Sequence, residues 1–243
     1  MGDNNRKRKQ HWNTHVKQKS VEPGLSGIFF TCDGHEKQAL AEAYNLIDEL
    51  MESVPGVSEE TVKEKTEESE SDEDIADTLK RQCNETREVT AKKERRCIQR
   101  PTGVKNCLFV TVKGADAVSL CDRMITLTQK SARCRYLQRA LPVEETAVVG
   151  LKEMEEVVLK LIQRHMVANS EGKLPTYALE FKARNNSQIK KQNVLDMMND
   201  AVGMIAPSAR VDLNGAEVTF FIQVVKKSIM AGAAKNYFNR RKY

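Results

Sequence analysis

The sequence predicts an α+β protein in which a ferredoxin-like half is followed by an alternating α/β half. In the first half, apolar runs follow one another in the order strand-helix-strand-strand-helix-strand, which is the order of a ferredoxin-like unit. In the second half, segments with helical spacing alternate with segments of period two. With 243 residues and a hydrophobic fraction of 40%, the chain is long enough for one large core or two small ones.

Two stretches are predicted to lie outside both halves. Residues 1–20 are polar and basic, and we expect a disordered tail because they cannot bury enough apolar area to offset the entropy of ordering. Residues 54–74 hold nine acidic residues and two lysines, which predicts a mobile acidic insertion. The whole chain has a formal net charge of +5, so the remainder carries +12. A basic body of this kind is typical of proteins that bind polyanions, and a merely solvated surface is the alternative.

The first half is predicted as a ferredoxin-like domain over residues 21–142. Asp33 stands three residues before Glu36, a capping-box spacing that predicts a helix start. Asp116 is the predicted N-cap of the second helix, and Pro142 is expected to close the half. The predicted strands are residues 28–31, 95–100, 106–113 and 136–141.

The second half is predicted over residues 143–243. Thr146 is expected to open a helix, and a half-buried strand follows over residues 177–183. Ser187 is the predicted cap of the next helix, which Pro207 ends. The pair Asn214-Gly215 predicts a hairpin turn between two strands. The remaining predictions are a helix face of Leu151, Met154, Val158, Leu161 and Ile162, strands at 211–213 and 218–224, and an edge strand at 228–233.

The cysteine pattern and the chain start indicate a reduced cytosolic or nuclear protein. None of the six cysteines forms a C-x-x-C pair, and several lie in apolar runs where a thiol behaves as a small hydrophobe. The N-terminus lacks the pattern of a signal peptide, and no apolar run approaches the ~18 residues of a membrane helix, so no membrane partner is expected. The run Arg6-Lys7-Arg8-Lys9 predicts either a nuclear localisation signal or a basic arm that touches RNA.

The usual motifs of catalysis are not found in the sequence. Gly172-Lys173 is followed by Leu174 instead of a hydroxyl residue, so the phosphate-binding P-loop pattern fails. No G-x-G-x-x-G follows a strand, and no G-x-S-x-G is present. His11 and His15 have the spacing of two zinc ligands but lack two further ones. We therefore expect no catalytic residue, no metal and no cofactor, and a protein that is not an enzyme.

Basic side chains form the candidate RNA-binding site. Arg184 ends a predicted strand beside Asn185 and Asn186, just ahead of a predicted helix N-terminus. A planar cation, amide donors and free backbone N–H groups together suit phosphate binding, and a simple turn is the alternative. Aromatic residues such as Tyr237 are interleaved with cations near the end of the chain, a pattern typical of stacking on RNA. The predicted RNA-binding residues are Arg135, Arg139, Lys182, Arg184, Asn185, Asn186, Lys226, Lys227, Lys235, Arg240 and Arg241.

Several short motifs resemble the THUMP family in their order and spacing. Residues 21–25 (Val-Glu-Pro-Gly-Leu), residues 27–32 and residues 42–44 (Glu-Ala-Tyr) are similar to the N-terminal ferredoxin-like region of stand-alone eukaryotic THUMP proteins. Residues 139–142 with Thr146 resemble the junction into the THUMP domain. The THUMP segment itself is resembled by residues 182, 184–187, 235–237 and 241–243.

The resemblance implies an RNA-binding function. THUMP domains bind structured RNA, usually tRNA, and the stand-alone form is implied to be a non-catalytic adaptor. It would present serine and leucine tRNAs to an RNA cytidine acetyltransferase that makes N4-acetylcytidine, in the nucleus or nucleolus and also in the cytoplasm. The alternatives are an RNA-modifying enzyme with an unrecognised site, and a protein-interaction scaffold that uses the acidic insertion.

Overall fold

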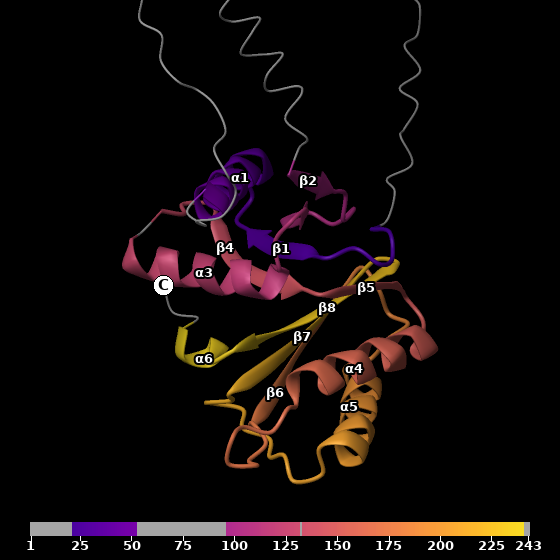
Figure 1. Cartoon of the computed structure of the whole chain (residues 1–243). Helices are drawn as coiled ribbons and strands as arrows, with labels where there is room; N and C mark the ends of the chain where they lie inside the picture. Colours follow the sequence, from indigo (N-terminus) through magenta and orange to yellow (C-terminus); the bar gives the residue numbers. More distant parts are fainter. Residues whose placement is uncertain (1–20, 53–95, 132, 241–243) are drawn as a thin grey trace, which may run out of the picture.

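The first four-stranded sheet confirms the predicted order of elements. The computed structural model describes residues 21–52, 96–131 and 133–240, so the segments 1–20 and 54–74, for which a disordered tail and an acidic insertion were predicted, lie outside the described residues. The elements are β1 (Gly27–Cys32), α1 (Glu36–Glu52), β2 (Cys97–Arg100), β3 (Cys107–Val112), α3 (Ala117–Lys130) and β4 (Leu137–Val143). The strand order is β2-β3-β1-β4, and β1 runs antiparallel to both of its neighbours (Figure 1). This β-α-β-β-α-β arrangement is the predicted ferredoxin-like one.

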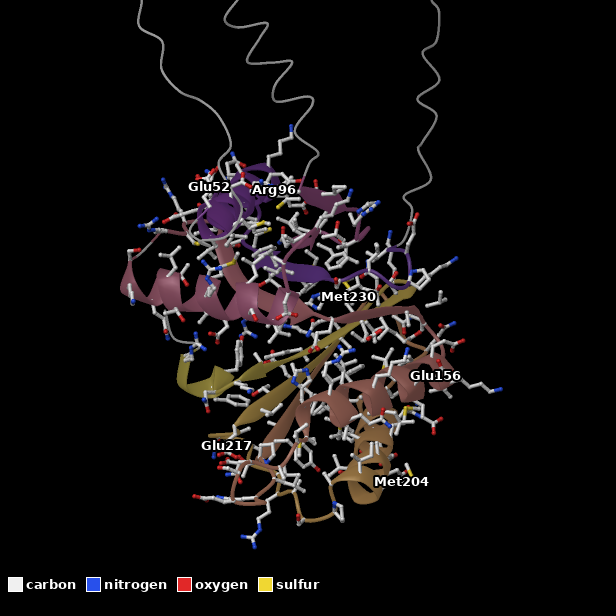
Figure 2. All side chains as sticks on the ribbon, in the orientation of Figure 1. Glu52, Arg96, Glu156, Met204, Glu217 and Met230 are labelled. Atoms are coloured by element: carbon white, nitrogen blue, oxygen red, sulfur yellow. The ribbon has the colours of Figure 1, made fainter. Side chains whose placement is uncertain are left out.

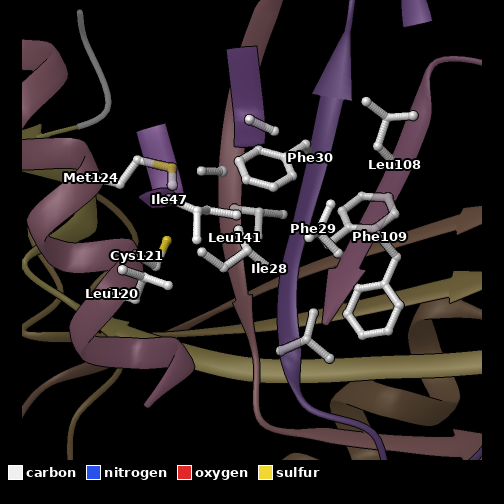
Figure 3. Packing of buried hydrophobic residues seen from close by; sticks show 14 of the residues in the cluster. Ile28, Phe29, Phe30, Ile47, Leu108, Phe109, Leu120, Cys121, Met124 and Leu141 are labelled. Carbon is white, nitrogen blue, oxygen red and sulfur yellow. The ribbon is translucent and has the colours of Figure 1, made fainter. Parts of the chain in front are cut away.

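The first sheet forms because its central strands are apolar on both faces. Ile28, Phe29 and Phe30 are all fully buried, and Phe29 pairs with Phe109 of β3. Figure 3 shows this aromatic pair beside each other, with Met124 of α3 on the other side of the cluster. All six residues of β3 are buried as well, so this strand is covered on both faces.

The ends of the helices confirm one predicted cap and correct another. Asp116 caps α3, because its carboxylate accepts a 2.8 Å hydrogen bond from the Ser119 backbone N–H. Glu36 does not act as the predicted capping-box partner of Asp33, because its carboxylate accepts a 2.7 Å hydrogen bond from the Asn106 backbone N–H. Glu36 therefore ties the start of α1 to the loop before β3.

The second sheet has the strand order β5-β8-β7-β6, with β6 parallel to β7. Two helices pack on one face of this sheet, and their buried side chains form the second core (Figure 1). The helical and strand periods of the sequence predicted most of these elements. They are β5 (Glu145–Val148), α4 (Leu151–His165), β6 (Tyr177–Arg184), α5 (Lys191–Ile205), β7 (Val218–Val225), β8 (Ser228–Lys235) and the short α6 (Tyr237–Arg240).

The prediction that Thr146 opens a helix is wrong. Thr146 lies in β5, a four-residue strand that pairs with β8, and α4 begins only at Leu151. The Thr146 hydroxyl accepts a 2.7 Å hydrogen bond from the Leu25 backbone N–H, and it lies within hydrogen-bond distance of the Glu22 carbonyl. Leu151 is 50% exposed and does not belong to the buried helix face. Because β5 covers one side of β8, β8 is an inner strand and not the predicted edge.

Two predicted turns also need correction. Ser187 does not cap α5, whose N-cap is Lys190. Asn214-Gly215 forms a turn around the Asp212 side chain, which accepts hydrogen bonds from both backbone N–H groups. The hairpin of this half lies elsewhere, between β7 and β8, with Lys226 and its neighbour as the two-residue loop. The predicted strand at 211–213 is reduced to one bridge between Val211 and Tyr177.

The two halves share part of one core. Phe221, Met230 and Tyr237 of the second half pack into the first core, and Figure 2 labels Met230 where the two sheets meet. A Cβ on Gly232 would lie 2.3 Å from the Pro142 carbonyl oxygen, so β8 and β4 pack backbone to backbone. The division at residues 142 and 143 stays a prediction. In the part of the chain that the structure describes, no helix is long and apolar enough to cross a membrane.

Candidate nucleic-acid interface

A basic cleft opens between the two sheets. Its volume is about 340 Å³, and its walls come from the ends of β1 and β3 and from β4 on one side, and from β6 and β7 on the other. Four cationic side chains line it together with two acidic ones. The cations are Lys105, Arg139, Lys182 and Arg184, and the acids are Asp33 and Glu180. Sequence reasoning predicted three of the four cations, and the structure brings them together from both halves.

Arg184 is held at the floor of the cleft by two contacts. Its guanidinium donates a 2.5 Å hydrogen bond to the side-chain oxygen of Gln223, and it lies over the Phe29 ring with 5.4 Å to the ring centroid. Phe29 belongs to β1 and Gln223 to β7, so Arg184 bridges the two sheets. A planar cation fixed in this way loses little entropy when it binds an anion.

The other cations of the cleft differ in whether they already have an acidic partner. Arg139 donates a 3.0 Å hydrogen bond to Glu180 across the cleft, while Lys182 and Lys105 are exposed. Burial raises the pKa of the Cys107 thiol above its usual value, whereas the nearby cations Arg184 and Lys182 act to lower it. Both cations therefore impose a positive potential at the cleft wall.

A hairpin tip and a loop extend the basic surface beside the cleft. Lys226 reaches over the β2–β3 loop, because a Cβ on Gly103 would lie 2.6 Å from the Lys226 Nζ atom. The Lys226 backbone donates a 3.0 Å hydrogen bond to the Arg184 carbonyl and accepts a 2.8 Å hydrogen bond from the Asn186 side chain. The predicted residue Asn186 thus holds the end of β6 to the hairpin tip, where Lys227 is exposed.

The helix N-terminus predicted beside Arg184 is not there. Asn186 accepts hydrogen bonds from the backbone N–H groups of Gln188 and Ile189, and α5 begins only at Lys191. Asn185 and Asn186 therefore lie in a turn ahead of α5, and their contact with RNA stays a prediction. Asn185 has a φ of 53°, a left-handed conformation that asparagine tolerates better than most residues.

Other predicted RNA-binding residues lie outside the cleft. The Arg135 guanidinium lies over the Tyr136 ring, with 5.6 Å to its centroid. Arg240 pairs with Asp122 of α3, and Arg241 lies outside the described residues. Lys235 is at the far end of β8 from the hairpin tip. As RNA contacts, these residues stay predictions.

Lys235 lines a second hollow, which we call the distal groove. Its volume is about 420 Å³, and it also contains Arg164, His165 and Lys173 with the acidic Glu171 and Glu217. Figure 2 shows Glu217 at the lower end of the second sheet.

Tyr237 is unavailable for stacking on RNA. It is 2% exposed and packs edge-on against Phe221, with 4.7 Å between the ring centroids. Tyr237 therefore occurs in this stretch as a core residue, because burying its aromatic ring is more favourable than leaving the ring exposed.

Sequence reasoning missed two residues of the cleft, Lys105 and Gln223. Lys105 lies in the β2–β3 loop, which nothing in the local sequence places beside β6. Gln223 did carry a signal, because it is a polar residue inside an apolar strand that is buried on both faces. Among the described residues, no group of three histidine, cysteine or acidic side chains could hold a metal ion.

Comparisons with known proteins agree on the second half of the chain. A model of the THUMP domain matches residues 150–230. THUMP domain-containing protein 1 of Mus musculus is 27% identical over 229 residues, which cover 93% of this chain and 65% of the mouse protein. The chain thus spans just under two thirds of that relative.

Two further proteins are similar over most of the chain. The protein named tRNA acetyltransferase TAN1 of Saccharomyces cerevisiae is 23% identical over 236 residues, which cover 86% of this chain and 78% of the yeast protein. The crystal structure of PH1313 from Pyrococcus horikoshii has a TM-score of 0.48 at 11% identity, and covers 88% of this chain and 56% of that one.

Proposed function

We propose, on the premise that this chain belongs to the THUMP domain-containing proteins, that it binds structured RNA, and tRNA in particular, in the cleft between its two sheets. The observation that carries the proposal is the convergence of Lys105, Arg139, Lys182 and Arg184 on one cleft. Phosphate contacts by lysine and arginine supply most of the sequence-independent affinity for RNA. The yeast relative is named a tRNA acetyltransferase, which favours tRNA as the RNA and acetylation as the reaction that this chain serves.

The proposed mechanism is positional. The two sheets share a core, so the cleft walls form one rigid surface that grips the RNA backbone by shape and charge. Holding tRNA against an RNA cytidine acetyltransferase raises the effective concentration of substrate at that enzyme, with no chemistry in this chain. Serine and leucine tRNAs, and N4-acetylcytidine as the product, are the substrate and product we propose.

An acetyltransferase activity of the chain itself is the second candidate function, because the yeast relative bears that name. The adaptor and the enzyme differ in what the purified chain does alone. We would incubate it with tRNA, acetyl-CoA and ATP, with and without the partner acetyltransferase, and measure N4-acetylcytidine by mass spectrometry. The adaptor predicts product only with the partner present. Product from this chain alone would establish the enzyme instead.

The RNA-binding part of the proposal has its own test. Arg184→Ala is expected to weaken binding of all tRNAs about equally, and to reduce the slope of log affinity against log salt by somewhat less than one. Arg133→Ala is the matched control, because Arg133 is a 45% exposed arginine that pairs with Glu49 away from the cleft. Filter binding of tRNA across a salt series measures both. An unchanged slope for Arg184→Ala would remove this arginine from the RNA interface.

A further inference from the structure

Gln223 is a buried polar side chain, and only one of its two polar atoms has a hydrogen-bond partner. It lies in the middle of β7, is 1% exposed and lines the floor of the cleft. Its side-chain oxygen accepts the hydrogen bond from Arg184, but its Nε2 atom finds no acceptor among the residues that the structure describes. Buried amides are satisfied in the great majority of proteins, so an unused donor at this place calls for an explanation.

The contact with Arg184 fixes which way the amide points. The guanidinium only donates hydrogen bonds, so the side-chain oxygen of Gln223 must face it. A flipped amide would set two donors against each other. The NH₂ group of Gln223 is therefore turned away from Arg184, with no competing orientation available.

The neighbours of this NH₂ group are cations. Lys182 pairs directly with Gln223 across the parallel strands β6 and β7, and Arg184 lies two residues further along β6. Side chains two residues apart on a strand share a face, so Lys182 and Arg184 both lie on the face that Gln223 occupies. The carboxylate of Glu180, the nearest acidic group on the same face of β6, is engaged by Arg139.

We infer that the floor of the cleft holds one phosphate group, to which the Gln223 amide donates a hydrogen bond while Arg184 and Lys182 neutralise its charge. The inference rests on the proposed function in one respect, because we take RNA to be the source of this phosphate group. A phosphate oxygen accepts hydrogen bonds and offers no donors, which suits a floor made of an amide N–H, a guanidinium and an ammonium group. The Watson–Crick edge of every RNA base also presents a donor, which this floor cannot accept.

The chain offers a control for the cost of an unsatisfied buried group. Thr219 lies four residues before Gln223 on the same face of β7, is fully buried and has no hydrogen-bond partner for its hydroxyl among the described residues. Unlike Gln223, it does not line the cleft. Thr219→Val therefore removes an unused hydroxyl alone, whereas Gln223→Met removes the unused N–H, which is a proposed phosphate ligand, together with the acceptor of Arg184.

The experiment compares these variants in the full chain, by thermal unfolding and by tRNA binding at fixed salt. Thr219→Val is expected to raise the Tm by about 2–4 °C, the shift that a modest gain in stability produces in a chain of this size, with unchanged tRNA affinity. Gln223→Met removes the acceptor of Arg184 as well as the unused N–H, so no gain in Tm is expected, and it should bind tRNA about tenfold more weakly, since a hydrogen bond to a charged group is lost. Gln223→Glu keeps the acceptor for Arg184 and should weaken binding further, because it sets a negative charge against the phosphate.

A second arm uses inorganic phosphate alone, compared with chloride at equal ionic strength. A phosphate-dependent rise in Tm that Gln223→Glu abolishes would show that the site takes free phosphate as well as RNA phosphate. No rise, together with weaker tRNA binding by both Gln223 variants, would assign the site to a phosphodiester of RNA. Native tRNA affinity and native phosphate response in both Gln223 variants would overturn the site while tRNA binding by the native chain stands. Failure of the native chain to bind tRNA would refute the proposed function, and the phosphate arm alone would then decide the site.

Discussion

The cleft and the distal groove are two hollows beside the same sheet, and a buried polar side chain lies at each. These two side chains differ in how many of their polar atoms have hydrogen-bond partners. Glu144 lies between β4 and β5 beside the groove, and its carboxylate is bound by His165 at 2.7 Å, by Arg164 at 2.8 Å and by the Ala233 backbone N–H at 3.0 Å. Gln223 in the cleft has one partner for two polar atoms. The hydrogen bonds of Glu144 stabilise the fold from within, whereas the unused donor of Gln223 is the one that we infer to bind a phosphate.

Each hollow contains both paired and exposed cations, since Arg139 of the cleft pairs with Glu180, and Lys173 and Lys235 of the groove are exposed. Arg164 of the groove is neutralised by Glu144 and Glu145. In the cleft, Lys182 and Lys105 are exposed, and Arg184 contacts only the neutral side chains of Gln223 and Phe29 in the contacts recorded for it. Whether a cation already has an acidic partner therefore indicates more about its role in RNA binding than whether it lies near a hollow.

The largest expected effect is on stability, at the groove. Glu144→Ala removes a nearly buried carboxylate, breaks its hydrogen bonds to α4 and leaves the Ala233 N–H without an acceptor, so we expect a loss of about 2–3 kcal/mol. Arg164→Ala should cost less than about 1 kcal/mol, because Arg164 is 48% exposed. Urea unfolding measures both. Equal losses for the two variants would show that Glu144 is not the centre of this network.

The same carboxylate predicts an acid-dependent loss of stability. Burial raises the pKa of Glu144, but hydrogen bonds from His165 and Arg164 outweigh it and hold the pKa below its ordinary value of 4.5. A depressed pKa in the folded state gives stability that is present above about pH 4.5 and is lost as the pH falls through the folded pKa. The free energy of unfolding should therefore decline more steeply below pH 4.5 in the native protein than in Glu144→Gln. Parallel curves for the two proteins would contradict this role.

The smallest expected effect is at the hairpin tip. Lys226 has a φ of 51°, a conformation that lysine adopts only at a cost and asparagine tolerates. Lys226→Asn should stabilise the fold by about 0.5 kcal/mol, while Lys227→Asn should not, since Lys227 is outside the left-handed region. Thermal unfolding of the two variants distinguishes them. A larger gain from Lys227→Asn would mean that the strain lies elsewhere in the loop.

The sequence predicted those elements whose signal is local. The apolar run of β1, the Asp116 cap of α3 and the strand at 218–224 are predicted from short stretches of sequence, and all three were confirmed. The strand β5 was missed because its four residues pair with β8, more than eighty positions further along the chain. Asn214-Gly215 has the stronger turn propensity, yet the hairpin forms at Lys226, because the parallel pairing of β6 and β7 decides where the chain must reverse.

Three of the four cations of the candidate site were predicted from the sequence, whereas Lys105 and Gln223 were not. Arg139, Lys182 and Arg184 were found because clustered charge is visible in a sequence. Lys105 was not found, because its loop meets β6 only through the packing of the two halves. Gln223 was overlooked because a single glutamine in a strand says nothing about its hydrogen bonds until its partners are known.

The measurement that tests the cleft most directly compares two charge-matched double variants in tRNA binding across a salt series. One removes Lys182 and Arg184 from the cleft, and the other removes Lys173 and Arg164 from the distal groove. The cleft variant should lower the slope of log affinity against log salt by somewhat less than two, and the groove variant should leave it nearly unchanged. Equal losses of slope, or a greater loss in the groove variant, would contradict a tRNA interface centred on the cleft.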